Sequence, residues 1–219
     1  MKRFLVLGYG GSGGSTLAYM MDQLRSDLAA EGIDRIPAGW QFVHVDVPSG
    51  EESGPDGLGN VEQQGGRYIG LGPKAGSYAD LDHTVSRRLA GNRALDTIGT
   101  WAPRNPASIA TPISVGAGQY RAVGRMITLS KVEQIRADLQ TAWDDLHRNE
   151  THSEMAQVAR TLKMDGYSQQ EVPIVLVVSS MAGGAGASMA LDVCRILTTI
   201  PGLDPKLMAV FMVSADIFD

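Results

Sequence analysis

The fold of this 219-residue chain is decided near its N-terminus, by the segment Phe4-Leu5-Val6-Leu7-Gly8-Tyr9-Gly10-Gly11-Ser12-Gly13-Gly14-Ser15-Thr16. The apolar run Phe4–Leu7 is short and ends at a glycine, which predicts a buried strand. A glycine-rich stretch, Gly8–Gly14, follows it, and apolar residues then recur at helical spacing over Ser15–Ala30. Strand, glycine loop and helix in this order are the context in which backbone N–H groups at a helix N-terminus bind phosphate.

The same order of elements returns near the other end of the chain. Val172–Val178 is strongly apolar and β-branched, which predicts a central parallel strand. Ser179–Gly186 is a second glycine-rich loop, and Ala187–Ile200 is predicted to be a helix. A third candidate loop, Gly116–Gly118, follows a brief predicted strand at Ile113–Val115. Since ligands bind at the carboxyl ends of parallel strands, we expect the three loops to converge on one crevice.

The rest of the chain supports an α/β fold with a doubly wound, mostly parallel sheet. Further buried strands are predicted at Trp40–Val47 and Leu207–Val213, and helices at Arg121–Leu129, Lys131–Asn149 and Glu154–Met164. Leu81–Ile98 is predicted to form one helix or two short ones. We expect a single domain over residues 1–219, with a long irregular loop at residues 49–76.

Composition limits the partners and the compartment. The net charge of -5 argues against nucleic-acid binding by general electrostatics, although backbone N–H groups still suffice for phosphate. The single cysteine, Cys194, excludes an internal disulfide and favours the reducing cytoplasm. No apolar stretch approaches the length needed to span a bilayer, so we expect no membrane partner.

Judged from their residues alone, the glycine loops are compatible with more than one kind of nucleotide. Gly8–Gly13 fits the dinucleotide fingerprint G-x-G-x-x-G, and Asp46 at the end of the second predicted strand is a candidate for a ribose hydroxyl. No lysine follows either main glycine loop, which disfavours a P-loop ATPase. Arg121 and Arg125 follow the third loop. They are either exposed charges on a helix or side chains that face a phosphate.

Together the three loops resemble those of the tubulin/FtsZ superfamily. Ala182–Ser188 is similar to the family signature G-G-G-T-G-[ST]-G, with Ala185 in place of the threonine. Gly116-Ala117-Gly118 and Gly124 keep the spacing of the G-A-G-A-N-P-x-x-G segment of FtsZ, and Phe4–Thr16 looks like its first loop. The chain is most similar to the bacterial group of tubulin-like domain proteins, which implies a Rossmann-like GTPase domain.

The resemblance also implies a binding site for GTP or GDP with Mg²⁺. Around the α and β phosphates it places Gly10, Gly11, Ser12 and Gly13. The main phosphate cradle is formed by Gly183, Gly184, Ala185 and Gly186, and the γ-phosphate is approached by Gly116, Ala117 and Gly118. Asp46 matches the place of a polar residue near the metal, and Ser15 stands where FtsZ has an asparagine that contacts guanine.

The resemblance covers only the N-terminal half of the family fold. We expect the chain to lack the C-terminal half, including the acidic N-x-D-x-x-D loop that activates water in the neighbouring subunit. Two functions remain compatible with such a chain, that of a slow GTPase and that of a filament or scaffold subunit. A filament or scaffold subunit would self-associate or bind another tubulin-like subunit. The alternative is an NAD(P)-dependent oxidoreductase, which Gly8–Gly13 and Asp46 support and which lacks a clear catalytic residue, since the four histidines are scattered.

Overall fold

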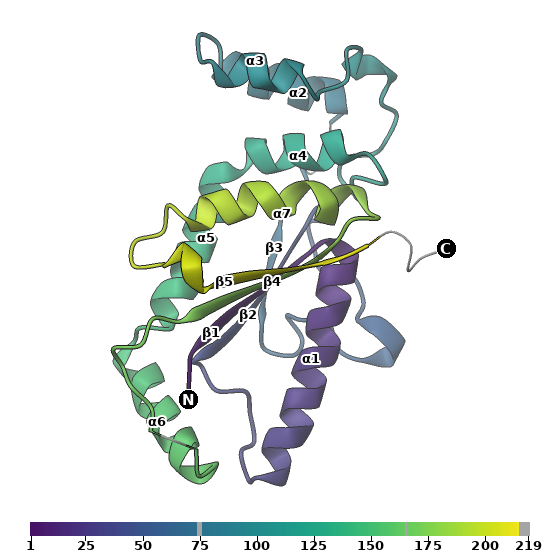
Figure 1. Ribbon diagram of the computed structural model, residues 1–219. Coiled ribbons are helices and arrows are strands. Elements are labelled where there is room, and N and C mark those ends of the chain that lie inside the picture. The colour runs from purple at the N-terminus through teal and green to yellow at the C-terminus, as the bar shows by residue number, and fades with distance from the viewer. Residues whose placement is uncertain (74–75, 165, 215–219) are drawn as a thin grey trace.

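Five parallel strands form the centre of the computed structural model, which describes residues 1–73, 76–164 and 166–214 (Figure 1). Every neighbouring pair of strands is parallel, in the order β3-β2-β1-β4-β5. The strands are β1 (Phe4–Tyr9), β2 (Trp40–Asp46), β3 (Arg67–Gly70), β4 (Ile174–Ser180) and β5 (Met208–Val213). The predicted parallel α/β sheet is therefore confirmed.

Seven α-helices connect and cover these strands in the described residues. They are α1 (Gly10–Ala30), α2 (Tyr78–Arg88), α3 (Ala94–Gly99), α4 (Arg121–Ser130), α5 (Val132–Asp145), α6 (Asn149–Thr161) and α7 (Gly184–Leu197). Short 3₁₀ turns lie at Pro55–Gly57, Pro106–Ser108 and Pro205–Leu207. None of the described helices combines the length and the apolar character needed to span a membrane.

The two faces of the sheet are buried against different helices, as a doubly wound fold requires. Side chains alternate along β1, so that Leu5 and Leu7 join the larger core cluster, which includes residues of α4, α5 and α7. Val6 points to the opposite face and belongs to a smaller cluster with residues of α1, such as Leu17. Both faces are apolar, which is why the strands of a parallel sheet read as nearly continuous apolar runs.

The third strand of the sheet is not where the sequence placed it. β3 lies inside the segment 49–76 that was predicted to be irregular, and pairs with β2 from Arg67 opposite Val43 to Gly70 opposite Asp46. Ile113–Val115 is a turn, with the Val115 N–H donating to the Pro112 carbonyl oxygen at 3.1 Å. The flanking proline and glycine favour such a turn more than the two β-branched residues favour a strand.

β5 was predicted to be buried and is an edge strand. It pairs with β4 alone among the described residues, and Val210 and Phe211 are 45% and 56% exposed. An apolar run shows that a strand has a buried partner surface somewhere, but it does not distinguish a central strand from an edge strand.

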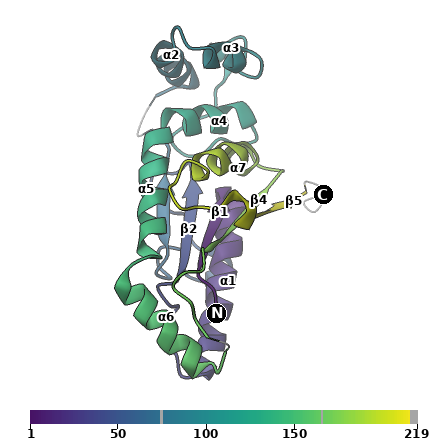
Figure 2. The ribbon, with the colours of Figure 1, turned by 60° about the vertical axis from the view of Figure 1, so that its left-hand side comes forward.

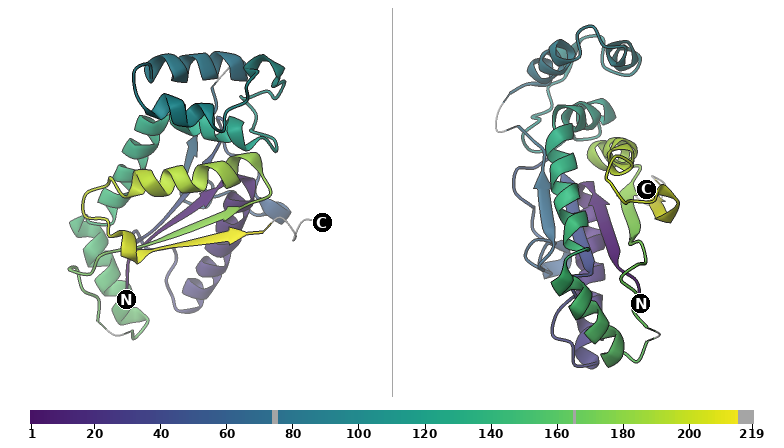
Figure 3. Two further views of the ribbon diagram at one scale, coloured as in Figure 1. Left: turned by 45° about the horizontal axis from the view of Figure 1, so that its top comes forward. Right: turned by 90° about the vertical axis from the view of Figure 1, so that its left-hand side faces the viewer.

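An α2–α3 segment, residues 76–112, stands outside the sheet layers. Figures 2 and 3 show α2 and α3 stacked beyond α4, on the side away from the strands. The predicted helical stretch Leu81–Ile98 thus forms two helices rather than one. Arg125 of α4 holds this segment against α4 through a cation–π contact, because its guanidinium lies 4.7 Å from the centre of the Trp101 ring.

Candidate functional site

Helix α1 starts without any intervening loop. β1 ends at Tyr9 and α1 begins at Gly10, which adopts a φ of 69°, a backbone conformation that favours glycine. The predicted loop Gly8–Gly14 is therefore mostly the first turn of the helix. No side chain caps this N-terminus, so that its first N–H groups remain directed to the carboxyl end of the sheet.

Helix α7 presents a second N-terminus of the same kind. It follows β4 after a connection of three residues and begins at Gly184, again without a side-chain cap. The two helix starts lie against each other: a Cβ placed on Gly10 would come within 2.9 Å of the Gly186 nitrogen. Figure 1 shows both helices beginning at the same end of the sheet. Their partial positive charges therefore add in one place.

The third loop is locked onto the second by backbone contact. The Gly184 N–H donates to the Gly118 carbonyl oxygen at 2.8 Å. A Cβ on Gly184 would lie 2.5 Å from that oxygen and 2.9 Å from the Tyr120 nitrogen, so that only glycine fits. This loop was predicted to follow a strand. It instead comes after the α2–α3 segment, and it reaches the common crevice from that side.

A crevice of about 200 Å³ opens between the three loops. The predicted site residues that line it are Gly10, Gly11, Ser12, Asp46, Gly116, Ala117, Gly118, Gly183, Gly184, Ala185 and Gly186. Two predicted residues lie elsewhere. Gly13 is buried beneath the first turn of α1, against the backbone of Gly8, and Ser15 lines a second, smaller cavity.

The side chains of the crevice are acidic. Asp46 and Glu52 line it, and no lysine or arginine does among the described residues. Burial raises the pKa of the Asp46 carboxyl, although its Oδ1 accepts the Val47 N–H at 2.7 Å. An anion bound here therefore depends on backbone N–H groups, and the two carboxylates leave room for a cation beside it.

Glu52 was missed at the sequence level. It belongs to the long segment 49–76, where nothing in the spacing marks one acid over another. The available signal was shared by Glu51 and Glu52, because both lie in the loop that leaves the carboxyl end of β2. No group of three or more metal-binding side chains is present in the described part of the chain. Two carboxylates plus phosphate oxygens and water are nevertheless a usual ligand set for Mg²⁺.

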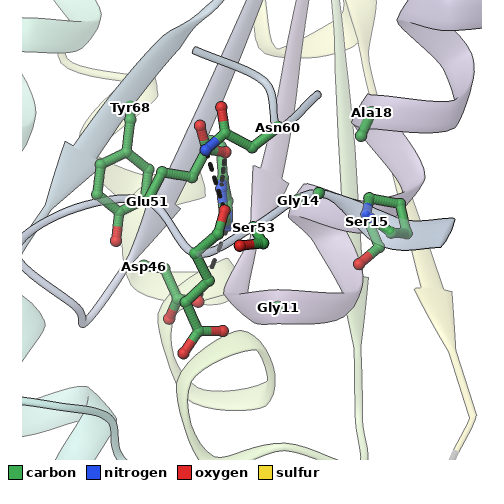
Figure 4. A pocket seen from close by; sticks show the side chains of 13 residues that line it. Gly11, Gly14, Ser15, Ala18, Asp46, Glu51, Ser53, Asn60 and Tyr68 are labelled. Carbon is green, nitrogen blue, oxygen red and sulfur yellow. Dashed lines mark hydrogen bonds and ion pairs between the residues drawn. The ribbon is translucent and has the colours of Figure 1, made fainter. Parts of the chain in front are cut away.

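A smaller cavity of about 100 Å³ lies on the other side of the first turn of α1. Figure 4 shows Asp46 and Glu51 on one side of it, and Gly14 and Ser15 of α1 on the other. His44 also lines this cavity and is only 5% exposed. Its Nδ1 lies 2.6 Å from Glu51 Oε1, and its Nε2 lies 3.1 Å from the Gly10 carbonyl oxygen. No role was assigned to this histidine from the sequence, and the structure places it in contact with the first turn of α1.

The two arginines of the third loop do not line the crevice. Arg121 is exposed and donates to the Met181 carbonyl oxygen at 2.9 Å. Arg125 pairs with Asp192 of α7, with 2.8 Å between Nε and Oδ2. Arg125 therefore joins two helices, and only Arg121 stays near the rim of the site.

Comparison with known proteins gives one family. Residues 5–219 match the family model described as tubulin like. No curated protein sequence matches the chain.

Solved structures are similar only in part. They include an empty FtsZ dimer from M. jannaschii, at 17% identity and a TM-score of 0.41 over 92% of this chain and 34% of that one. They also include the GDP-bound monomer of CetZ1 from Haloferax volcanii, at 15% identity and a TM-score of 0.40 over 97% of this chain and 41% of that one. The chain spans less than half the length of either protein.

Proposed function

The chain belongs to the tubulin-like family, and from this premise we propose that it binds a guanine nucleotide with Mg²⁺ in the crevice between its three glycine loops. The phosphates lie over the first turns of α1 and α7, and the third loop, Gly116–Gly118, closes on the terminal phosphate. The proposed site uses the residues that the sequence assigned to it, except that Gly13 and Ser15 do not contact the nucleotide and instead support the first turn of α1.

The convergence of two uncapped helix N-termini on one crevice carries this proposal. The first turn of any α-helix has N–H groups without intrahelical partners, and neither α1 nor α7 fills them with a capping side chain. Two such ends side by side fit a chain of two or three phosphates better than a single phosphate. A dinucleotide fold accounts for the α1 end and leaves the α7 end without a role.

Magnesium supplies the charge that the crevice lacks. The lining residues in the described part of the chain carry two acids and no basic side chain, so only the partial charges of the two helix N-termini oppose the charge of a free polyphosphate. A cation between the phosphates, Asp46 and Glu52 offsets the repulsion. We expect nucleotide affinity to depend strongly on Mg²⁺ and to fall on chelation.

Calorimetry with GTP, GDP, ATP and NAD⁺, with Mg²⁺ present, tests the ligand. Preference for GTP and GDP supports the proposal. Preference for NAD⁺ favours the oxidoreductase alternative, and absence of binding to all four refutes nucleotide binding by this chain. The same titrations in the presence of a chelator measure the contribution of the cation.

A single glycine variant tests the place of binding. A Cβ on Gly11 meets no atom within 4 Å, although Gly11 lines the crevice, so Gly11→Val fills ligand space without disturbing the fold. We expect nucleotide affinity to fall by about tenfold or more. Gly99→Val in α3, which also meets no atom within 4 Å, is the matched control. Unchanged affinity in Gly11→Val contradicts the site assignment.

A second tubulin-like subunit is the partner that the rim of the crevice fits. Tyr120 and Met181 are 55% and 44% exposed beside the glycine loops, and apolar side chains at a ligand mouth favour an interface that covers it. Light scattering with and without nucleotide measures assembly. Tyr120→Ser with Met181→Ser is expected to reduce it, whereas Leu191→Ser on α7, where Leu191 is 70% exposed, serves as the control.

Hydrolysis is a separate question. We assign no crevice residue to the activation of water, so binding is the activity proposed for this chain by itself. Phosphate release from GTP, measured over a range of protein concentrations, distinguishes slow turnover within one subunit from turnover that needs assembly.

A further inference from the structure

Another cavity, of about 450 Å³, lies at the opposite end of the sheet from the crevice. It is lined by Trp40 and Phe42, at the start of β2, and by Gln64–Gly66, just before β3. The crevice lies beside Asp46, at the far end of β2. The stretch of strand from Trp40 to Asp46 spans about 20 Å, at about 3.3 Å per residue. The two cavities are therefore separate sites.

The sheet is narrower beside this cavity than at its other end. β3 pairs with β2 only from Val43 onward, so the first residues of β2 have no strand on their outer side in the described chain. Met21 and Arg25 of α1 line the cavity from above these residues, because side chains at this spacing lie on one face of a helix. The space that remains has the volume of a small-molecule pocket, roughly 300–1,000 Å³.

The apolar side chains of the cavity are held in place by the core. Met21 and Phe42 are 2% and 3% exposed, and Ile36 and Trp40 are partly buried against the same cluster. The Trp40 ring is fixed further, because its Nε1–H donates to the Lys2 carbonyl oxygen at 3.1 Å. A ligand with a flat apolar body thus meets a wall that is already ordered, which lowers the entropic cost of binding.

The guanidinium of Arg25 is the polar group of this cavity that lacks acceptors. Among the described residues it donates to Gln64 Oε1 alone, and its Nε is buried without a hydrogen-bond partner. The side chain as a whole is partly exposed and lines the cavity. A buried N–H group without an acceptor is rare in folded proteins, and it favours a ligand that brings one.

The charges around the cavity favour a ligand with one negative charge. Asp34 and Arg35 also line it, and both are exposed. Arg35 pairs with Glu154 of α6, with 2.8 Å between Nη2 and Oε1, whereas Arg25 forms no ion pair within the described part of the chain. Asp34 disfavours a doubly charged phosphate. A carboxylate suits the site, because the guanidinium of arginine binds its planar pair of oxygens well.

From these features we propose that the cavity binds a small organic carboxylate with a flat apolar body. The carboxylate accepts hydrogen bonds from the Arg25 guanidinium, and the apolar body lies against Trp40 and Phe42. The inference goes beyond the proposed function and does not depend on it, since no residue lines both this cavity and the crevice.

Phenylacetate and its neutral counterpart phenylacetamide are the probes that test this site. Both fit the apolar wall, and only phenylacetate carries the charge that Arg25 favours. ¹H–¹⁵N NMR of the free and titrated protein follows the Trp40 indole N–H and the Arg25 Nε–H. We expect phenylacetate to shift both signals and to bind at least about tenfold more tightly than phenylacetamide. If phenylacetate shifts neither signal, the proposal is overturned.

Arg25→Met keeps the apolar stem of the side chain and removes its charge and N–H groups. We expect this variant to bind the two probes about equally, whereas Arg87→Met, at an exposed position on α2, keeps the preference for phenylacetate. The backbone amide spectrum shows whether Arg25→Met is folded. If it is not, Arg25→Lys replaces it and is expected to lose most of the preference, because lysine lacks the planar group. A preference that persists in full in the folded variant refutes the role of Arg25.

Discussion

Replacing Gly184 with alanine is expected to destabilise the fold by separating the second and third loops. The added Cβ would lie 2.5 Å from the Gly118 carbonyl oxygen, 2.9 Å from the Tyr120 nitrogen and 3.0 Å from the Ala117 carbonyl oxygen. All three are backbone atoms, so no side-chain rotation relieves the contact. The third loop must withdraw instead, and its hydrogen bond from the Gly184 N–H, now 2.8 Å long, is stretched or lost.

The magnitude follows from these contacts. Overpacking of one methyl group in a rigid site costs about 1–3 kcal/mol, and a lost buried hydrogen bond about 0.5–1.5 kcal/mol. Alanine is the better helix former by up to about 1 kcal/mol, which offsets part of the loss at this first helical position. We expect the unfolding free energy to fall by about 2 kcal/mol, or the melting temperature by about 4–8 °C for a chain of this size.

Urea unfolding followed by circular dichroism measures this change, and Gly183→Ala is the matched control. Gly183 is adjacent, has an extended φ of -85°, and its Cβ would meet no atom within 4 Å. We expect the control to stay within about 0.5 kcal/mol of the wild type, because alanine fits its conformation without strain. Equal stability of the two variants would refute the interlocking of the loops.

Three further predictions concern other parts of the molecule. Arg3, which is 2% exposed, donates to the carbonyl oxygens of Leu146 at 2.7 Å and Gln169 at 3.1 Å and also to that of Glu171, so Arg3→Met should lower the unfolding free energy by about 2–4 kcal/mol, with partial recovery in Arg3→Lys. Full stability of Arg3→Met in urea unfolding would contradict this. Burial raises the pKa of the Asp46 carboxyl above its ordinary value of 3.8, so the folded state binds the carboxyl proton more tightly than the unfolded state does. The folded state therefore loses stability as pH rises from 3.8 through the higher folded-state pKa. Asp46→Asn should therefore be the more stable protein at neutral pH and equal to the wild type in acid below that window, as measured by unfolding across pH; equal stability of the two at neutral pH contradicts the shift. Arg125 joins Asp192 of α7 to Trp101 of the α2–α3 segment, so Arg125→Ala should speed limited proteolysis within residues 89–112, and an unchanged cleavage rate would show that the segment is held by other contacts.

The pattern of residues determined the fold class and most of the crevice. Apolar runs that lead into glycine-rich segments, as at Phe4–Leu7 and Val172–Val178, mark strands whose carboxyl ends meet on one edge of a parallel sheet. Eleven of the thirteen predicted residues line the crevice, and eight of them lie at the ends of β1, β2 and β4, whereas Gly116, Ala117 and Gly118 follow a turn. The exceptions, Gly13 and Ser15, fall on other faces of α1, because the helix begins at Gly10 and its periodicity turns them away.

Tertiary structure alone decided what depends on contacts between distant segments. β3 is a four-residue strand with too little apolar periodicity to be recognised, and it exists because β2 offers it a hydrogen-bonding edge. Likewise, Glu51 meets His44 only because the segment after β2 folds back beneath α1. Local sequence determines which residues are able to form a strand, a helix start or a hydrogen bond, whereas long-range packing determines which of them meet.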